Sequence, residues 1–163
     1  MKPTFVKLDE MCIAGIGIRT TNQQQSEGNG SIGELWQRYY TEGIQDRTPN
    51  RLDSEVVLGV YSGYENDEHG AYNLLIGAAV RPGSDVPQEL TVLSIPAGTY
   101  AVFTTRRGPI VEVVVEAWSH VWEWSHQSGN KRTFTADFER YDGHNCADPS
   151  NAQVQLYIAC ERD

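Results

Sequence analysis

The chain has 163 residues, which suits a single domain or two closely fused half-domains and leaves little room for a separate DNA-binding domain. Its 13 Lys and Arg residues against 22 Asp and Glu residues give a formal net charge of −9, which argues against direct nucleic-acid binding and favours cationic partners. No segment approaches the roughly 18 apolar residues of a membrane span, and the start of the chain lacks a secretory signal, so we expect a cytoplasmic protein.

The first half of the chain is predicted to form a strand, a helix and a hairpin. The predicted elements are a strand over 12–21, a helix over 32–43, and strands over 56–64 and 72–80. The helix follows the polar spacer 22–30 and opens with a capping-box pattern between Ser31 and Glu34. The turn-like sequence 65–70 joins the two later strands.

The second half repeats this order. Its predicted elements are a strand over 90–108, a helix that opens at Gly108-Pro109 and ends near Gly129, and hairpin strands over 132–142 and 154–163. We therefore expect one α+β domain over residues 1–163, built from tandem βαββ repeats at about 10–82 and 88–162. The expected antiparallel sheet carries two main helices on one side and a central ligand groove between the halves on the other.

Neither a metal centre nor a catalytic triad is predicted. The three cysteines lack CxxC spacing, and His144 with Cys146 is a single pair where a metal needs three or four ligands. No Ser or Cys lies in a nucleophile-elbow sequence. Glu112 and Glu116, four residues apart, are expected to be solvated on the wet face of a helix. We expect no cofactor.

The second predicted helix is amphipathic. Its polar face holds Glu112, Glu116, Ser119 and Glu123, and its apolar residues Val111, Val114, Trp118, Val121 and Trp122 lie largely away from that face. Trp118 and Trp122 are therefore interpreted as core residues and not as ligand contacts.

The segment TFTADFERYD (133–142) places two different sets of side chains on the faces of a strand. Those sets are Phe134, Ala136 and Phe138 on one face, and Asp137, Glu139 and Tyr141 on the other. The first set is expected to pack beneath the second helix. The second set is then either a solvated sheet face, where Glu and Tyr are ordinary, or the wall of a groove.

Several segments, taken in order, resemble the GyrI-like effector-binding domain. They are ELW in the first helix, GVYSGY, IPAGTYAVFTTRRGPI, WSHVWEW, DFERYD and VQLYIACERD. The resemblance covers about residues 10–162. This family forms the ligand-sensing part of AraC-type and MerR-type multidrug regulators and also occurs alone, including in integron cassettes. The regulators carry a helix-turn-helix domain ahead of it, whereas about ten residues precede the first predicted strand here, which suggests the stand-alone form.

The resemblance implies a central groove that binds amphipathic, often cationic, compounds through a strand glutamate and several aromatic side chains. The family glutamate falls on Glu139, which would be the counter-charge for the ligand. The expected ligand-binding residues are Glu139, Tyr141, Tyr157, Tyr61, Tyr100 and Trp36. Hairpin pairing is expected to bring Tyr157 beside Glu139, and Tyr61 lies at about the repeat-equivalent position. Tyr100 and Trp36 match groove positions of the family.

Three functions remain open at this point. The leading one is a module that binds amphipathic organic cations without turnover, either to sequester them or as a sensor that could dock to a separate DNA-binding regulator. The second is a GyrI-like hydrolase of strained electrophilic compounds, in which Glu139 and a nearby tyrosine activate water. The third is a protein-interaction module. None of the three involves direct contact with nucleic acid or a membrane.

Overall fold

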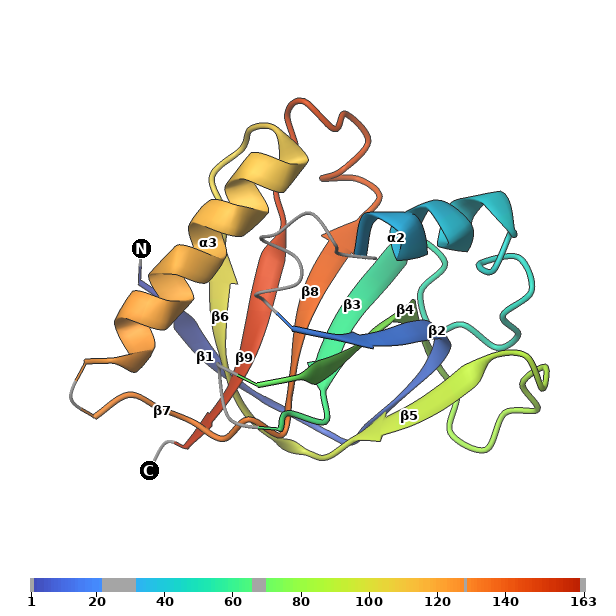
Figure 1. Ribbon diagram of the computed structural model, residues 1–163, viewed down its shortest axis with the longest axis horizontal. Coiled ribbons are helices and arrows are strands. Elements are labelled where there is room, and N and C mark those ends of the chain that lie inside the picture. The colour runs from blue at the N-terminus through green and yellow to red at the C-terminus, as the bar shows by residue number, and fades with distance from the viewer. Residues whose placement is uncertain (1, 22–31, 66–69, 128, 162–163) are drawn as a thin grey trace.

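The computed structural model describes residues 2–21, 32–65, 70–127 and 129–161 (Figure 1). The expected spacer at 22–30, the capping residue Ser31 and most of the expected turn at 65–70 lie outside the described residues. The described elements are β1 (Thr4–Leu8), β2 (Met11–Thr20), α2 (Ile32–Thr41), β3 (Val56–Ser62), β4 (Tyr72–Val80), β5 (Thr91–Ile95), β6 (Gly98–Thr104), α3 (Ile110–Ser125), β7 (Lys131–Arg132), β8 (Ala136–Asp142) and β9 (Gln155–Glu161).

The nine described strands form one antiparallel sheet in the order β1-β6-β9-β8-β3-β4-β2-β5, with the short β7 also paired to β9. Helix α2 packs against β2 and β4, and α3 packs against β6 and β9, so each half of the sheet carries one helix (Figure 1). The expected α+β fold with an antiparallel sheet and two main helices is confirmed. Neither described helix has the length and apolar character of a membrane span.

Edge strands are exchanged between the two βαββ halves. The first half is β2-α2-β3-β4, the second is β6-α3-β8-β9, and they meet where β3 pairs with β8. Strand β1 precedes β2 in the chain but pairs with β6, and β5 precedes β6 but pairs with β2. This interleaving supports our proposal that the two repeats fold together as one domain.

The prediction of a single strand over 90–108 is wrong. It is two strands, β5 and β6, with Pro96 in the break between them. Proline has no N–H to donate to the ladder, and the chain leaves the edge beside β2 here to join β9 instead. Strand β1 was not expected, because it lies ahead of the first predicted strand. The single strand expected over 132–142 is divided into β7 and β8, and Phe134 between them has a positive φ of 54°.

The expectation about which face of β8 packs beneath the second helix is also wrong. Phe138 and Ala136 do not pack beneath α3; they belong to a buried cluster on the helix-free face. That cluster includes residues of β1 and β5, at the two ends of the sheet, as well as of the central strands. The sheet therefore curls around it, and a face without helices becomes a core. Alternation along β8 separates its two faces but does not say which one the helices cover.

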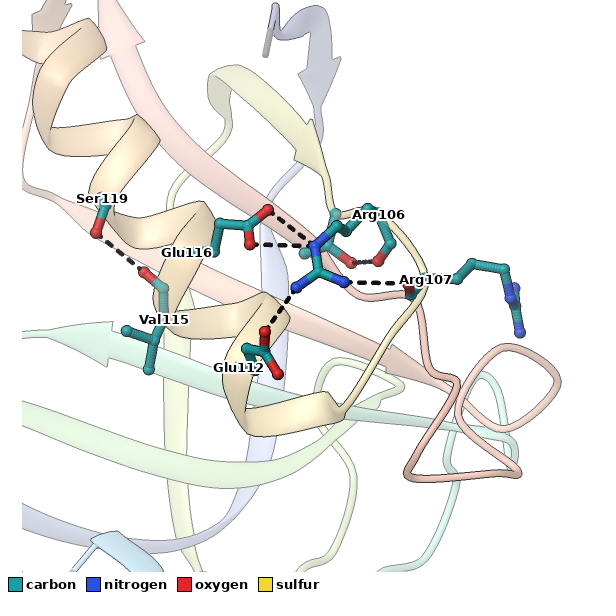
Figure 2. A network of polar contacts seen from close by, with 7 residues as sticks. Arg106, Arg107, Glu112, Val115, Glu116 and Ser119 are labelled. Carbon is teal, nitrogen blue, oxygen red and sulfur yellow. Dashed lines mark hydrogen bonds and ion pairs between the residues drawn. The ribbon is translucent and has the colours of Figure 1, made fainter.

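The buried face of α3 differs from the expected one. It consists of Val113, Ala117, Val121 and Trp124. Val111, Val115 and Trp122 are 73%, 61% and 40% exposed, so the core assignment of Trp122 is wrong. On the polar side, Arg106 pairs with Glu112 at 2.9 Å and with Glu116 at 3.1 Å, and both carboxylates face solvent as expected (Figure 2).

Two glycines allow β2 and β4 to approach closely. Gly15 and Gly77 are cross-strand partners. A Cβ atom on Gly15 would lie 2.0 Å from the Ile76 carbonyl oxygen, and one on Gly77 would lie 2.1 Å from the Ala14 carbonyl oxygen. Because both neighbours are backbone atoms, a side chain at either position would force the strands apart.

We therefore expect Gly15→Ala to lower the free energy of unfolding by about 3 kcal/mol, at the upper end of overpacking effects. The matched control is Gly33→Ala in α2, where nothing lies within 4 Å of the added Cβ. The control should leave the free energy of unfolding unchanged or raise it by up to about 1 kcal/mol. Urea unfolding of the three proteins measures both, and equal stability of the two variants would contradict the close approach.

Candidate functional site

A buried carboxylate lies at the junction of the two halves. Glu139 is in β8, directly opposite Gly59 of β3, and it is 3% exposed. Its Oε2 accepts hydrogen bonds from the Tyr61 hydroxyl at 2.9 Å and from Trp118 Nε1 at 2.7 Å. Its Oε1 accepts one from the Tyr141 hydroxyl at 2.7 Å. All three donors are neutral side chains.

No cationic side chain pairs with Glu139 in the part of the chain that the structure describes. Burial raises the pKa of the Glu139 carboxyl above its ordinary value, and the hydrogen bonds from Trp118, Tyr141 and Tyr61 oppose that rise. The pKa values of the Tyr61 and Tyr141 hydroxyls are raised well above the ordinary value, first by burial and then by the charge of Glu139. The phenols therefore remain protonated donors, and the group among these side chains that can carry a negative charge is the Glu139 carboxyl.

Gly59 makes room for the carboxylate. A Cβ atom at this position would lie 3.2 Å from Glu139 Oε1 and 3.7 Å from the Trp36 ring atom Cζ2. Directly opposite residues of an antiparallel pair have neighbouring side chains on one face, so Gly59 is the position where a side chain would crowd Glu139 most. The absence of one lets the acid and the indole of α2 share the space.

Aromatic rings from both helices surround the carboxylate. Trp36 of α2 meets the Tyr141 ring edge-on at a centroid distance of 5.0 Å and stacks on Tyr40 at 6.2 Å. Trp118 of α3 meets the Tyr61 ring edge-on at 5.2 Å. One negative charge among ring faces and edges is an arrangement that attracts organic cations.

The structure brings together four of the six residues expected at the site: Glu139, Tyr141, Tyr61 and Trp36. It adds Trp118, which the sequence analysis assigned to the core. Trp118 lies at the edge of the buried face of α3, where helical periodicity does not separate a core side chain from one that turns toward the middle of the sheet.

The expectation that Tyr157 lies beside Glu139 is wrong. In the β8–β9 register Glu139 pairs with Leu156, and Tyr157 pairs with Phe138. The Tyr157 and Phe138 rings stack at 4.5 Å, and Tyr100 lies 5.6 Å from Phe138 in the same cluster. A one-residue difference in register moves a side chain to the opposite face of the sheet, so Tyr157 and Tyr100 lie on the helix-free face, away from the carboxylate.

A second buried carboxylate lies two residues before Glu139. Asp137 is fully buried and forms an ion pair with Arg132 Nη2 at 2.7 Å. Its Oδ2 also accepts a hydrogen bond from the Tyr64 hydroxyl, and its Oδ1 accepts one from the backbone N–H of Ala159. Asp137 therefore has a cationic partner, in contrast to Glu139.

A surface pocket of about 460 Å³ shares Tyr141 with the site. Its wall also includes Glu55 and His144, whose Oε2 and Nε2 lie 2.6 Å apart, and Asp142 is close enough for the three residues to offer ligand atoms to one metal ion. The Glu55 and His144 side chains are 53% and 79% exposed, and Arg140 also contacts Asp142. Exposed groups of this kind do not by themselves define a metal site.

Comparison with known proteins identifies the family. Residues 4–160 match the family described as "Cass2: Integron-associated effector binding protein". YobU of Bacillus subtilis (strain 168), which bears the name of a transcriptional regulator protein, is 34% identical over 155 residues, or 95% of each chain.

Solved structures share the fold. An integron cassette protein from the mobile metagenome of Vibrio cholerae has a TM-score of 0.74 and 27% identity, covering 98% of this chain and 96% of the other. SAV2435, whose structure was solved with bound tetraphenylphosphonium, has a TM-score of 0.79 and 22% identity, covering 99% and 94%. At 22% identity the second similarity concerns the fold alone.

The raised pKa of Glu139 allows a prediction of how the free energy of unfolding changes with pH. Because the folded state holds this proton more tightly than the unfolded chain does, ionisation of Glu139 lowers the free energy of unfolding as the pH rises above about 4.5, the ordinary glutamate value. In Glu139→Gln the amide oxygen can accept from Tyr61 and Trp118, and the amide N–H can donate to the Tyr141 hydroxyl, which rotates. The variant should therefore be at least as stable as wild type at pH 7.

Urea unfolding of both proteins between pH 4 and pH 8 tests this. The difference in free energy of unfolding should be largest near pH 8 and should shrink as the pH falls toward 4.5. Glu123→Gln, on the exposed side of α3, is the control and should show no such change. A Glu139→Gln variant that is less stable than wild type at every pH would mean that the ionised carboxylate stabilises the fold.

Proposed function

We propose that this chain, which belongs to the integron-associated effector-binding family, is a stand-alone module that binds amphipathic organic cations at Glu139. The family and its regulator relatives support the coarser function of effector binding. The cationic character of the effector is our proposal, and it rests mainly on one observation. A carboxylate that is 3% exposed has only neutral hydrogen-bond donors around it.

A buried charge without a counter-charge is unfavourable, so a site of this kind favours a ligand that supplies the missing positive charge. The aromatic side chains of Trp36, Tyr61, Trp118 and Tyr141 offer an apolar surface for the organic part of that ligand. We propose these four residues and Glu139 as the ligand-binding set. Tyr100 and Tyr157 then contribute to packing of the helix-free core.

The expected interaction energies between the site and an organic cation are sufficient for micromolar binding. A unit charge about 4 Å from a carboxylate gains roughly 4 kcal/mol at an effective dielectric constant near 20, and each well-placed ring adds about 0.5 to 2 kcal/mol. Displacing one hydrogen bond from the carboxylate costs about 1.5 to 3 kcal/mol. Micromolar binding requires about 8 kcal/mol, and burial of the organic groups can supply the difference without close shape matching.

The relatives support the same proposal. SAV2435 binds tetraphenylphosphonium, a bulky aromatic cation, on a similar fold. YobU bears the name of a transcriptional regulator protein, which fits a role in which ligand binding changes the rate of transcription. We propose that such a role here would involve a separate DNA-binding protein. A cytoplasmic location is part of this proposal, and the three free cysteines are consistent with a reducing compartment.

The test is calorimetric titration of tetraphenylphosphonium into wild type and Glu139→Gln. Removing the charge while keeping the size of the side chain should weaken binding by roughly 5-fold to 150-fold, or about 1 to 3 kcal/mol. Neutral triphenylphosphine oxide should bind the two proteins with similar affinity, since it has no formal charge.

The control variant is Glu123→Gln, which removes an exposed charge of α3 and should leave both affinities unchanged. Equal affinity of wild type and Glu139→Gln for tetraphenylphosphonium would show that Glu139 is not the counter-charge. If the control weakens binding as much as Glu139→Gln does, the effect reflects the overall negative charge of the protein and not the site.

A further inference from the structure

A buried arginine beside the site has unused hydrogen-bond donors. The Arg132 side chain is 3% exposed, and its Nη2 donates to Asp137 Oδ2 at 2.7 Å. Its Nε and Nη1 atoms are buried and have no hydrogen-bond partner within the described residues. Buried donors without partners are uncommon, and each one calls for an explanation.

The structural role of Arg132 does not supply that explanation. The ion pair with Asp137 lies where the ladder between β8 and β9 gives way to the pairing of β7 with β9, and Asp137 Oδ1 there accepts the Ala159 N–H. This arrangement joins the two short stretches of sheet. It uses only one of the guanidinium nitrogens, Nη2.

Arg132 is separated from Glu139 by a single indole ring. The guanidinium carbon lies 5.9 Å from the Trp118 ring centroid and 4.2 Å from the Phe134 ring centroid. The same Trp118 ring donates its N–H to Glu139 at 2.7 Å. One aromatic ring thus contacts the carboxylate at its edge and the guanidinium at its face.

Resting on the proposed function, we propose that Arg132 is a second ligand-recognition residue, whose free N–H groups bind a carbonyl oxygen of the effector while Glu139 binds its cationic group. A planar aromatic ligand that displaces the Trp118 N–H from Glu139 places its cationic group against the carboxylate, and its far edge extends toward Arg132. A carbonyl group on the ligand then adds a hydrogen bond that the indole does not make. The preferred effector class is an aromatic cation that also carries a carbonyl oxygen.

The charges around Arg132 favour a neutral carbonyl oxygen on the ligand over a carboxylate. Arg132 is already matched by Asp137, so the pair as a whole is neutral. A ligand carboxylate would lie near both Asp137 and Glu139 and would be repelled by them. A carbonyl oxygen accepts from the guanidinium without adding negative charge, and hydrogen bonds from charged donors are the stronger kind.

The test uses two probes that differ by one group: the N-benzylpyridinium cation and the 1-benzylnicotinamide cation, which carries an added carboxamide. We expect the carboxamide probe to bind wild type about 10-fold more tightly, the effect of one hydrogen bond to a charged donor. In Arg132→Lys, which keeps a positive charge for Asp137 but removes the free guanidinium donors, this preference should disappear. Affinity for N-benzylpyridinium should stay the same.

Arg38→Lys, at an exposed position of α2, is the matched control and should keep the 10-fold preference. Glu139→Gln should weaken both probes equally. If Glu139→Gln weakens both probes but wild type does not prefer the carboxamide, the inference about Arg132 is wrong and the cation site stands. If Glu139→Gln changes neither affinity, the proposed function itself fails.

Even if Arg132→Lys does not fold, which its circular dichroism would show, the lack of a carboxamide preference in wild type overturns the assignment. A preference that persists in a folded Arg132→Lys would overturn the assignment, because the carboxamide would then be recognised by another group. Loss of the preference in Arg38→Lys would likewise overturn it.

Discussion

The structure depends on how a single buried carboxylate is held. Glu139 lies where β3 pairs with β8, at the centre of the sheet, where the two βαββ halves join. A charge at this depth would be strongly unfavourable without partners, and three hydrogen bonds from Tyr61, Trp118 and Tyr141 offset much of that cost. These donors come from β3, α3 and β8, so satisfying the carboxylate fixes the position of α3 relative to the central strands. The charge itself remains uncompensated within the described residues.

The two-fold arrangement of the halves explains why the site is there. Each half contributes a helix, and each helix turns one tryptophan, Trp36 or Trp118, toward the central strands. The halves cannot separate readily, because β1 and β5 each complete the sheet of the other half.

Strand periodicity predicted part of the site well and part of it badly, for one physical reason. The two-residue alternation correctly grouped Glu139 with Tyr141 on one face of β8, but it carries no information on which face the helices cover. Both faces of this curled sheet are apolar and buried, so the usual contrast between a core face and a wet face is missing. The hairpin register, which removes Tyr157 from the site, depends on loop geometry that the sequence pattern does not determine. Trp118 was missed because the helix brings it to the margin of its buried face.

The donors around Glu139 also set what a ligand must provide. A neutral compound that displaces Trp118 or a tyrosine from the carboxylate exchanges one hydrogen bond for another and gains little. A cation exchanges a hydrogen bond for a charge pair, which the low dielectric of the site strengthens. An anion meets Glu139, Asp137 and an overall formal charge of −9, and the buried Arg132 beside the site is already paired with Asp137. In our proposal, selectivity for cations arises from the balance between neutral donors and a fixed negative charge, and it does not require a cavity shaped to one compound.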